Sequence, residues 1–417
     1  MKYGLIGNPL GHSHSPFLHC FFGDDSYVLE QIDEGRLEDF LKERDFLAVN
    51  VTIPYKRAVM SRLDGISAVA EECDAVNTVV NRDGKLYGFN TDLFGMEFAL
   101  TRAGISLKGK NVVVLGSGGT SHTAQVLARH CGARSVKVVS RTGQYNYNNL
   151  LPVRDAEVLF NTTPVGMFPN MSAAPVDLGC FPALEGLFDA VYNPLRTRLV
   201  QQAKSLGIKC ADGLLMLAAQ AKASRNLFTG GIMPVPGDER EEKLILAARD
   251  ALKRRLTNIV LTGMPGSGKS TVGAAVADML GRQFVDADAE IVKAAGKSIP
   301  DIFAEEGETG FRKRESEVLR ILGDKQGIVL ATGGGAPLSP ENRLNLRANG
   351  YVVYLDRDLR ALPTDGRPLS QKGDLKKMYD ERRAAYEATA DVKVENNAAP
   401  EDAAREITEK FNESSCD

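Results

Sequence analysis

The sequence predicts an α/β protein with parallel sheets, and three observations support this prediction. Short apolar runs rich in β-branched residues alternate with segments of helical spacing along the whole chain. Two such runs, 111–115 and 258–263, lead straight into glycine-rich loops that open helices. The length of 417 residues suits two or three domains at roughly 150 residues each.

The composition excludes several other classes of protein. With 43% hydrophobic and 25% charged residues, the chain is neither collagen-like nor disordered. A net charge of −3 gives no basic field for nucleic acid or an anionic membrane. No apolar run reaches the ~20 residues that span a bilayer. The six cysteines form no Cys-x-x-Cys pair, so we expect reduced thiols and a cytoplasmic protein.

The first part of the chain is expected to alternate strands with helices. A charged helix closes this part, with Asp238 as its N-cap and Lys253-Arg254-Arg255 at its basic end. We place the domain boundary near residue 256, with a junction of only a few residues. The predicted strands cover residues 2–7, 27–31, 48–52, 111–115, 135–140, 158–161 and 187–190, and the predicted helices cover 121–130 and 214–228.

The second part is expected to be a separate domain, residues 257–417. It begins with the strand at 258–263, and further strands are expected to end at Asp286 and to cover 327–332 and 351–355. The tail after Ala390 is polar and charged, and we expect it to be frayed.

The second part opens on a complete phosphate-binding motif. The stretch Gly-Met-Pro-Gly-Ser-Gly-Lys-Ser, residues 263–270, fits the Walker-A pattern between a strand and a predicted helix at 271–280. Glycines turn backbone N–H groups toward nucleotide phosphates, while the lysine bridges two phosphates and the last serine binds Mg²⁺. A chance glycine turn is the alternative. The predicted ATP-binding residues are Gly263, Gly266, Ser267, Gly268, Lys269, Ser270 and Thr271.

Charged residues downstream suit a small acidic acceptor. Strand alternation predicts that Asp286 and Asp288 face the phosphate loop from one side, the first toward Mg²⁺ and the second toward a substrate hydroxyl. Arg312 suits a substrate carboxylate, and three glycines at 333–335 let an acceptor lie against bare backbone. Taken singly, each of these charges is more often a solvated surface group.

The order of these motifs resembles shikimate kinase over residues 257–411. The carrying motifs are Walker-A, Asp-x-Asp, Gly-Glu-x-x-Phe-Arg, Gly-Gly-Gly, Arg-Pro-Leu and Arg-x-x-x-Tyr. The sequence departs from the usual pattern of this family in two places. The stretch from Leu355 to Arg367 is shorter, and Ala384-Ala385 stands in place of the usual Pro-Leu. The resemblance implies Lys269 and Arg367 as catalytic residues, Ser270 and Asp286 for magnesium, and Asp288, Arg312, Gly333, Gly334, Gly335 and Arg382 as shikimate ligands.

A second glycine motif lies in the first part. Gly116-Ser117-Gly118-Gly119 follows a strand and opens a helix, as in a dinucleotide site or a plain tight turn. The next strand ends in Arg141-Thr142 with no acidic residue. A guanidinium there suits the 2′-phosphate of NADP, whereas an exposed arginine at a strand end is the alternative.

The first part also offers many short polar groups and a lysine–aspartate pair. Such a set suits a small polyhydroxy acid with a reactive carbonyl, although turn capping would equally explain Thr52 and Asn77. The polar groups in question are Ser13, Ser15, Thr52, Lys56, Asn77 and Asp92.

Residues 1–256 as a whole resemble shikimate dehydrogenase. Three further stretches, 161–167, 189–194 and 213–220, carry the resemblance. It implies a substrate lobe at about 1–100 and 213–256, and a Rossmann-like NADP lobe at about 101–212. About twenty residues separate Arg141-Thr142 from Asn161, too few for the usual helix and strand. The implied residues are Lys56 and Asp92 for catalysis, Ser13, Ser15, Thr52, Asn77, Tyr192 and Gln220 for substrate, and Gly116, Gly118, Gly119, Arg141, Thr142, Asn161 and Thr163 for NADP.

Together the two resemblances imply one bifunctional enzyme of aromatic amino acid biosynthesis. It would reduce 3-dehydroshikimate to shikimate with NADPH and then phosphorylate shikimate with MgATP. One alternative is an NAD-using quinate/shikimate dehydrogenase joined to a kinase for another small polyol. A non-catalytic sensor of NADPH and ATP is the other. The expected partners are small molecules only, and the oligomeric state is left open.

Overall fold

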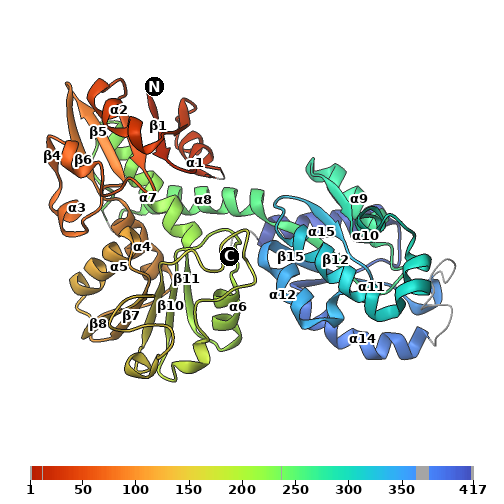
Figure 1. The fold of residues 1–417 in the computed structure, drawn as a ribbon. Helices are drawn as coiled ribbons and strands as arrows, with labels where there is room; N and C mark the ends of the chain where they lie inside the picture. The colour runs from red at the N-terminus through yellow and green to blue at the C-terminus, as the bar shows by residue number, and fades with distance from the viewer. Residues whose placement is uncertain (1, 12, 236, 363–374, 415–417) are drawn as a thin grey trace. The chain divides into compact units, whose positions relative to one another are not determined.

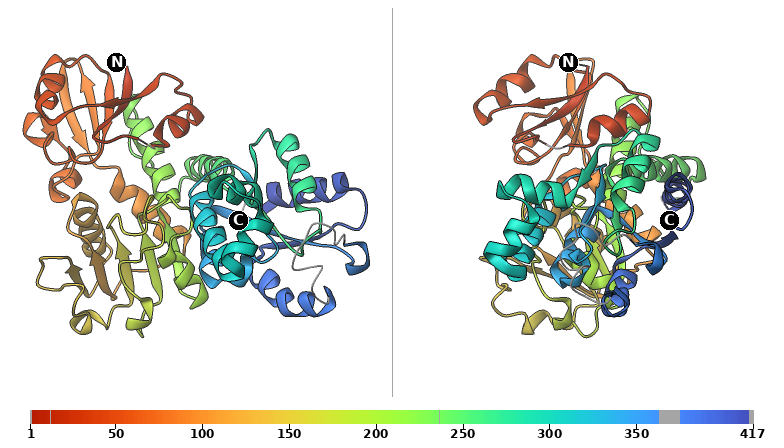
Figure 2. Two further views of the ribbon diagram at one scale, coloured as in Figure 1. Left: turned by 45° about the vertical axis from the view of Figure 1, so that its right-hand side comes forward. Right: turned by 90° about the vertical axis from the view of Figure 1, so that its right-hand side faces the viewer.

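The computed structural model describes residues 2–11, 13–235, 237–362 and 375–414, and it divides into two compact units. Figures 1 and 2 show the sheets of the first unit in red to yellow-green and the sheet of the second in teal and blue. The first unit comprises Met1–Met167, Ala173–Asn193 and Leu199–Leu252, and the second comprises Phe168–Ser172, Pro194–Arg198 and Lys253–Asp417.

The first sheet is mixed, so the predicted parallel arrangement holds for only some of its strand pairs. Its strand order is β2-β1-β3-β5-β6-β4, and β5 runs antiparallel to both β3 and β6. Asp83 and Gly84 have φ of 51° and 80°, the mirror-image turn that joins twisted strands in a hairpin. The elements are β1 (Tyr3–Gly7), α1 (Ser15–Phe21), β2 (Tyr27–Gln31), α2 (Leu37–Glu43), β3 (Ala48–Val51), β4 (Gly65–Ile66), α3 (Ala68–Glu72), β5 (Thr78–Arg82) and β6 (Lys85–Phe89).

The second sheet is fully parallel, with the order β11-β10-β9-β7-β8. β8 lies at the edge, and the chain from β8 to β9 holds no α-helix or named strand, only a 3₁₀ turn at Leu151–Val153. The shortened connection predicted there is confirmed. The elements are α4 (Asp92–Arg102), β7 (Asn111–Leu115), α5 (Gly119–His130), β8 (Ser135–Val139), β9 (Val158–Asn161), β10 (Gly186–Asp189), α6 (Arg198–Ser205) and β11 (Lys209–Asp212).

Two helices pack against each other where the chain passes between these sheets, α4 and α7 (Gly213–Phe228). α7 begins directly after β11, and a Cβ at Gly213 would overlap the carbonyl of Ala190, so only glycine fits there. α8 (Glu239–Leu256) follows, and the Asp238 side chain accepts hydrogen bonds from the N–H groups of Arg240 and Glu241. The predicted N-cap is therefore confirmed.

The third sheet is also fully parallel, with the order β13-β14-β12-β15-β16. Apolar side chains of β12, β14 and β15 are buried on both faces of the sheet. Its elements are β12 (Asn258–Thr262), α9 (Lys269–Leu280), β13 (Phe284–Asp286), α10 (Ala287–Ala295), α11 (Ile299–Gly323), β14 (Val329–Ala331), α12 (Pro340–Asn349), β15 (Gly350–Asp356), α14 (Leu375–Thr389), β16 (Val392–Glu395) and α15 (Pro400–Ser414).

The expectation of a frayed tail after Ala390 is wrong for the described residues, which extend to Ser414. β16 adds a strand to the sheet, and α15 packs against α9. Ala403, Ala404, Ile407 and Phe411 recur at helical spacing and are buried in the core. The polar composition of the tail reflects the solvent face of one amphipathic helix. No helix among the described residues is long and apolar enough to cross a membrane.

Candidate active sites

A cavity of about 170 Å³ in the first unit collects the polar residues predicted to hold a small hydroxy acid. They come from the start of α1 and the loop before it, the chain after β3, the residue before β5, the start of α4, the chain after β10, and α7. Ser13 and Ser15 are hydrogen-bonded to each other through their hydroxyls at 3.1 Å. The predicted residues that line this cavity are Ser13, Ser15, Thr52, Lys56, Asn77, Asp92, Tyr192 and Gln220.

Lys56 and Asp92 form an ion pair in this cavity. The Lys56 Nζ lies 2.6 Å from Asp92 Oδ2, and the two side chains are 18% and 8% exposed. Asp92 is the first residue of α4, where the helix dipole favours a carboxylate. A paired ammonium of this kind is held in place to donate a hydrogen bond to a bound oxygen.

Asn77 is fixed in the cavity wall by a buried hydrogen-bond network. Its Oδ1 accepts from the Thr91 N–H at 2.8 Å, and its Nδ2 donates to the Thr91 hydroxyl at 2.9 Å. Asn50 donates to Ser224 on α7 at 2.8 Å and to Thr78 at 3.1 Å, which ties β3 and β5 to that helix. Most of the hydrogen-bonding capacity of Asn77 is therefore used within the protein.

A larger cavity of about 930 Å³ adjoins the first, because Lys56 and Thr120 line both. Gly116 has a φ of 108°, which favours glycine, and leads into the open N-terminus of α5. Backbone N–H groups at such a helix start bind phosphate. The predicted NADP residues that line this cavity are Gly116, Gly118, Gly119, Arg141 and Thr163.

Two predicted NADP residues do not line the cavity. Asn161 is fully buried, accepts from the Thr163 hydroxyl at 2.7 Å and donates to Asp189 at 2.9 Å. It therefore shapes the loop that carries Thr163. Thr142 follows the exposed Arg141 but is not among the lining residues.

Several other residues of this wall were not predicted, among them His122 in the first turn of α5 and Tyr147. Tyr147 belongs to the short connection after β8, and burial raises the pKa of its hydroxyl. The shortened spacing was visible in the sequence, but nothing there indicated that its tyrosine turns toward the cavity.

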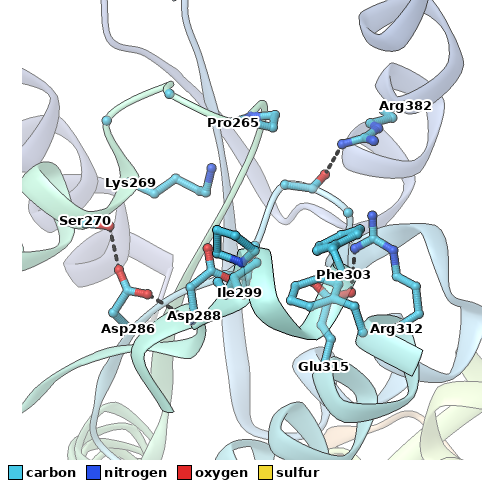
Figure 3. Close-up of a pocket in the computed structure, with 18 of the residues that line it drawn as sticks. Pro265, Lys269, Ser270, Asp286, Asp288, Ile299, Phe303, Arg312, Glu315 and Arg382 are labelled. Atoms are coloured by element: carbon cyan, nitrogen blue, oxygen red, sulfur yellow. Dashed lines mark hydrogen bonds and ion pairs between the residues drawn. The ribbon is translucent and has the colours of Figure 1, made fainter. Parts of the chain in front are cut away.

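The second unit holds a cavity of about 430 Å³ in which the phosphate loop meets the acidic residues (Figure 3). The Lys269 Nζ donates to the carbonyls of Gly263 at 3.0 Å and Met264 at 2.9 Å, within its own loop. The Ser270 hydroxyl donates to Asp286 Oδ2 at 2.6 Å. Gly266, Gly268 and Thr271 also line the cavity, whereas Gly263 and the buried Ser267 do not.

Asp286 and Asp288 both face this cavity, although strand alternation is not the reason. Asp286 ends β13 and caps α10, accepting from the Asp288 N–H at 2.9 Å, so Asp288 belongs to the first helical turn. Burial first, and then the Asp286 charge, raise the pKa of Asp288. The described residues contain no group of three or more His, Cys, Asp or Glu side chains that could hold a metal ion.

Glu315 is an acidic residue of the site that the sequence analysis missed. It lies one helical turn after Arg312 and pairs with its Nη1 at 2.8 Å, and burial raises the pKa of Glu315. Glu315 Oε1 and Asp288 Oδ1 are buried and have no hydrogen-bond partner in the part of the chain that the structure describes. A Cβ at Gly333 would lie 2.7 Å from the first and 3.0 Å from the second, so the glycine leaves room for both.

Two side chains of α14 hold the glycine loop from the other side. Arg382 Nη1 donates to the Gly334 carbonyl at 3.3 Å, and the buried Tyr386 hydroxyl donates to the same oxygen. Burial raises the pKa of Tyr386 to about 12, so it remains a donor. Gly335 and Arg357 also line the cavity, and Arg357 was not predicted. Arg367 lies outside the described residues.

The folds and cavities define a two-part enzyme, with a dinucleotide-type cavity in one unit and a P-loop cavity in the other. Comparison with known proteins identifies both parts. Residues 5–79 match the model of the shikimate dehydrogenase substrate binding domain, and residues 265–412 match the shikimate kinase model.

Curated relatives support the first assignment. Shikimate dehydrogenase (NADP(+)) of Clostridium perfringens is 34% identical over 55% of this chain and 92% of its own length. The enzyme of the same name from Thermus thermophilus is 37% identical over 60% of this chain and 99% of its own. A crystal structure of the Thermus thermophilus enzyme with NADP(H) and shikimate matches with a TM-score of 0.53 and 36% identity over 60% of this chain and 99% of that one.

This chain therefore belongs to the shikimate dehydrogenase family and carries a shikimate kinase domain after it. Both parts belong to enzymes of the shikimate pathway, as the two resemblances predicted.

Proposed function

We propose that this protein reduces 3-dehydroshikimate to shikimate with NADPH and then phosphorylates shikimate to shikimate 3-phosphate with MgATP. In this proposal residues 1–256 form the dehydrogenase and 257–417 the kinase. The observation that carries it is the Lys56–Asp92 pair at 2.6 Å, placed where a small polar cavity meets a dinucleotide-sized one.

The first reaction needs a hydride at the ketone carbon and a proton at its oxygen. NADPH, when bound, supplies the hydride. Lys56 donates a hydrogen bond to the ketone oxygen, and Asp92 orients the Lys56 ammonium group. The Lys56–Asp92 pair then delivers the proton to that oxygen as the hydride reaches the carbon. The glycines of the loop before α5, the start of that helix and Arg141 suit the phosphates of NADP.

The second reaction transfers a phosphoryl group to the hydroxyl that the first reaction creates. MgATP, when bound, supplies that group, with Lys269, Ser270 and Asp286 as the residues that suit its phosphates and metal. Asp288 accepts the hydrogen bond of the attacking hydroxyl, and Arg312 and Arg382 bind the carboxylate of shikimate.

One reaction mixture tests the proposal. The full chain is given 3-dehydroshikimate, NADPH, ATP and Mg²⁺, and NADPH consumption is followed beside the mass of the products. We expect both NADPH loss and shikimate 3-phosphate, and shikimate alone when ATP is omitted. Equal rates with NADH would contradict the NADP assignment, and no turnover by folded protein would favour a sensor.

A further inference from the structure

Arg357 follows a strand that runs next to the phosphate loop. It follows β15, the strand that pairs with β12 and so runs next to the strand that leads into the loop. The contact is close, because a Cβ at Gly263 would overlap the carbonyl of Leu355. Arg357 lines the same cavity as Gly266, Gly268 and Lys269.

The side chain of Arg357 has one unsatisfied donor on its buried side, within the described part of the chain. Its Nε is buried and has no hydrogen-bond partner among the described residues. The two neighbouring acids are engaged elsewhere, Asp356 with Lys393 at 2.8 Å and Asp358 with the N–H of Arg360 at 2.9 Å. A buried donor without a partner is costly, and an anionic ligand would remove that cost.

The position of Arg357 in the cavity indicates whether it binds the nucleotide phosphates or the acid substrate. The other two arginines of the cavity wall, Arg312 on α11 and Arg382 on α14, contact the glycine loop or Glu315 at the acid end. Arg357 instead extends from the strand beside the phosphate loop, where Lys269 and the start of α9 lie. A planar guanidinium binds phosphate oxygens in pairs, which suits it to that end.

We propose that Arg357 binds the phosphate groups of the nucleotide in the kinase cavity, as a cation additional to Lys269. This inference rests on the proposed kinase function and adds a nucleotide-binding residue to it.

Binding of MgADP to the full chain, measured by titration calorimetry, tests the role of Arg357. The variant Arg357→Met should weaken MgADP binding about tenfold or more, the usual range for a charge-assisted hydrogen bond. Arg357→Lys should lose less, because it keeps a charge but not the paired geometry. The KM for shikimate and the dehydrogenase kinetics should stay unchanged. Arg360→Met, on an exposed side chain outside the cavity lining, is the matched control.

Two results would overturn the inference while leaving the proposed function intact. One is MgADP affinity of Arg357→Met within twofold of wild type. The other is a raised KM for shikimate with unchanged MgADP affinity, which would assign Arg357 to the acid substrate. If the wild-type chain itself bound no MgADP, the proposed kinase function would fail, and the inference with it.

Discussion

The dehydrogenase and kinase cavities differ in how their charges are balanced within the protein. In the first unit, Lys56 and Asp92 neutralise each other at 2.6 Å. In the second, Asp288, Glu315 and Arg357 each keep a buried polar atom without a hydrogen-bond partner, and no residue lining the first unit's two cavities does so among those described. The kinase cavity therefore leaves more of its charge for ligands to satisfy, at a cost to the stability of the empty domain.

The first way to test this comparison is to remove one lysine from each cavity. Lys56→Met should lower the dehydrogenase kcat about a thousandfold, within the range for a lost proton donor or oxyanion contact, and leave the kinase unchanged. Lys269→Met should do the reverse, since Lys269 belongs to the phosphate loop. Steady-state assays of both activities on each variant supply the check. Loss of both activities in a folded variant would show that the two sites are not independent.

The same substitution at the two aspartates should change stability in opposite directions. The pKa of Asp288 is raised in the folded protein, so its carboxyl lowers the free energy of unfolding once the pH has risen through that folded-state pKa. Asp288→Asn removes this ionisation and should therefore stabilise the second unit near pH 7. Asp92→Asn should destabilise the first unit by about 1 kcal/mol or more, because Lys56 loses its charged partner. Both variants should lose activity at their own site.

Calorimetric melting with hydrogen exchange on α10 and α4 assigns each change to its unit. Variants at the exposed Asp301 and Asp39 serve as controls for the loss of one carboxylate, since neither residue lines the kinase cavity or the small dehydrogenase cavity. A lower melting temperature of the second unit in Asp288→Asn would contradict the idea that this cavity stores uncompensated charge.

Much of both sites was predictable because their residues lie in short contiguous motifs at strand ends. The parallel pairing of β12 and β14 brings the phosphate loop close to the glycine triplet. Both motifs, residues 263–270 and 333–335, can be recognised in the sequence. Glu315 and Arg357 could not be found this way. Their roles depend on which face of α11 and which end of β15 turn toward the cavity, and tertiary packing alone decides that.

The errors in the fold have two different causes. The β5–β6 hairpin carried a readable signal, Asp83-Gly84 between two β-rich runs, which was overlooked. The last helix was not predicted because its segment is polar on average, although Ile407 and Phe411 have helical spacing and lie in the core. Strand alternation misplaced Asp288 because the strand ends at Asp286 and a helix starts at once.

The smallest effect is expected at Arg141, because this charged side chain is exposed whereas the charged groups compared above are largely buried. Arg141 is exposed at the end of the edge strand β8, so solvent and salt screen its charge far more than that of a buried group. Arg141→Gln should raise the KM for NADPH about tenfold at low salt and less at high salt, in line with one screened phosphate contact. The KM for NADH should stay the same, because NADH lacks the 2′-phosphate, and Arg154→Gln in the same unit is a control outside the cavity lining. If the KM for both cofactors rose together, Arg141 would contact a part that they share, and the 2′-phosphate assignment would be wrong.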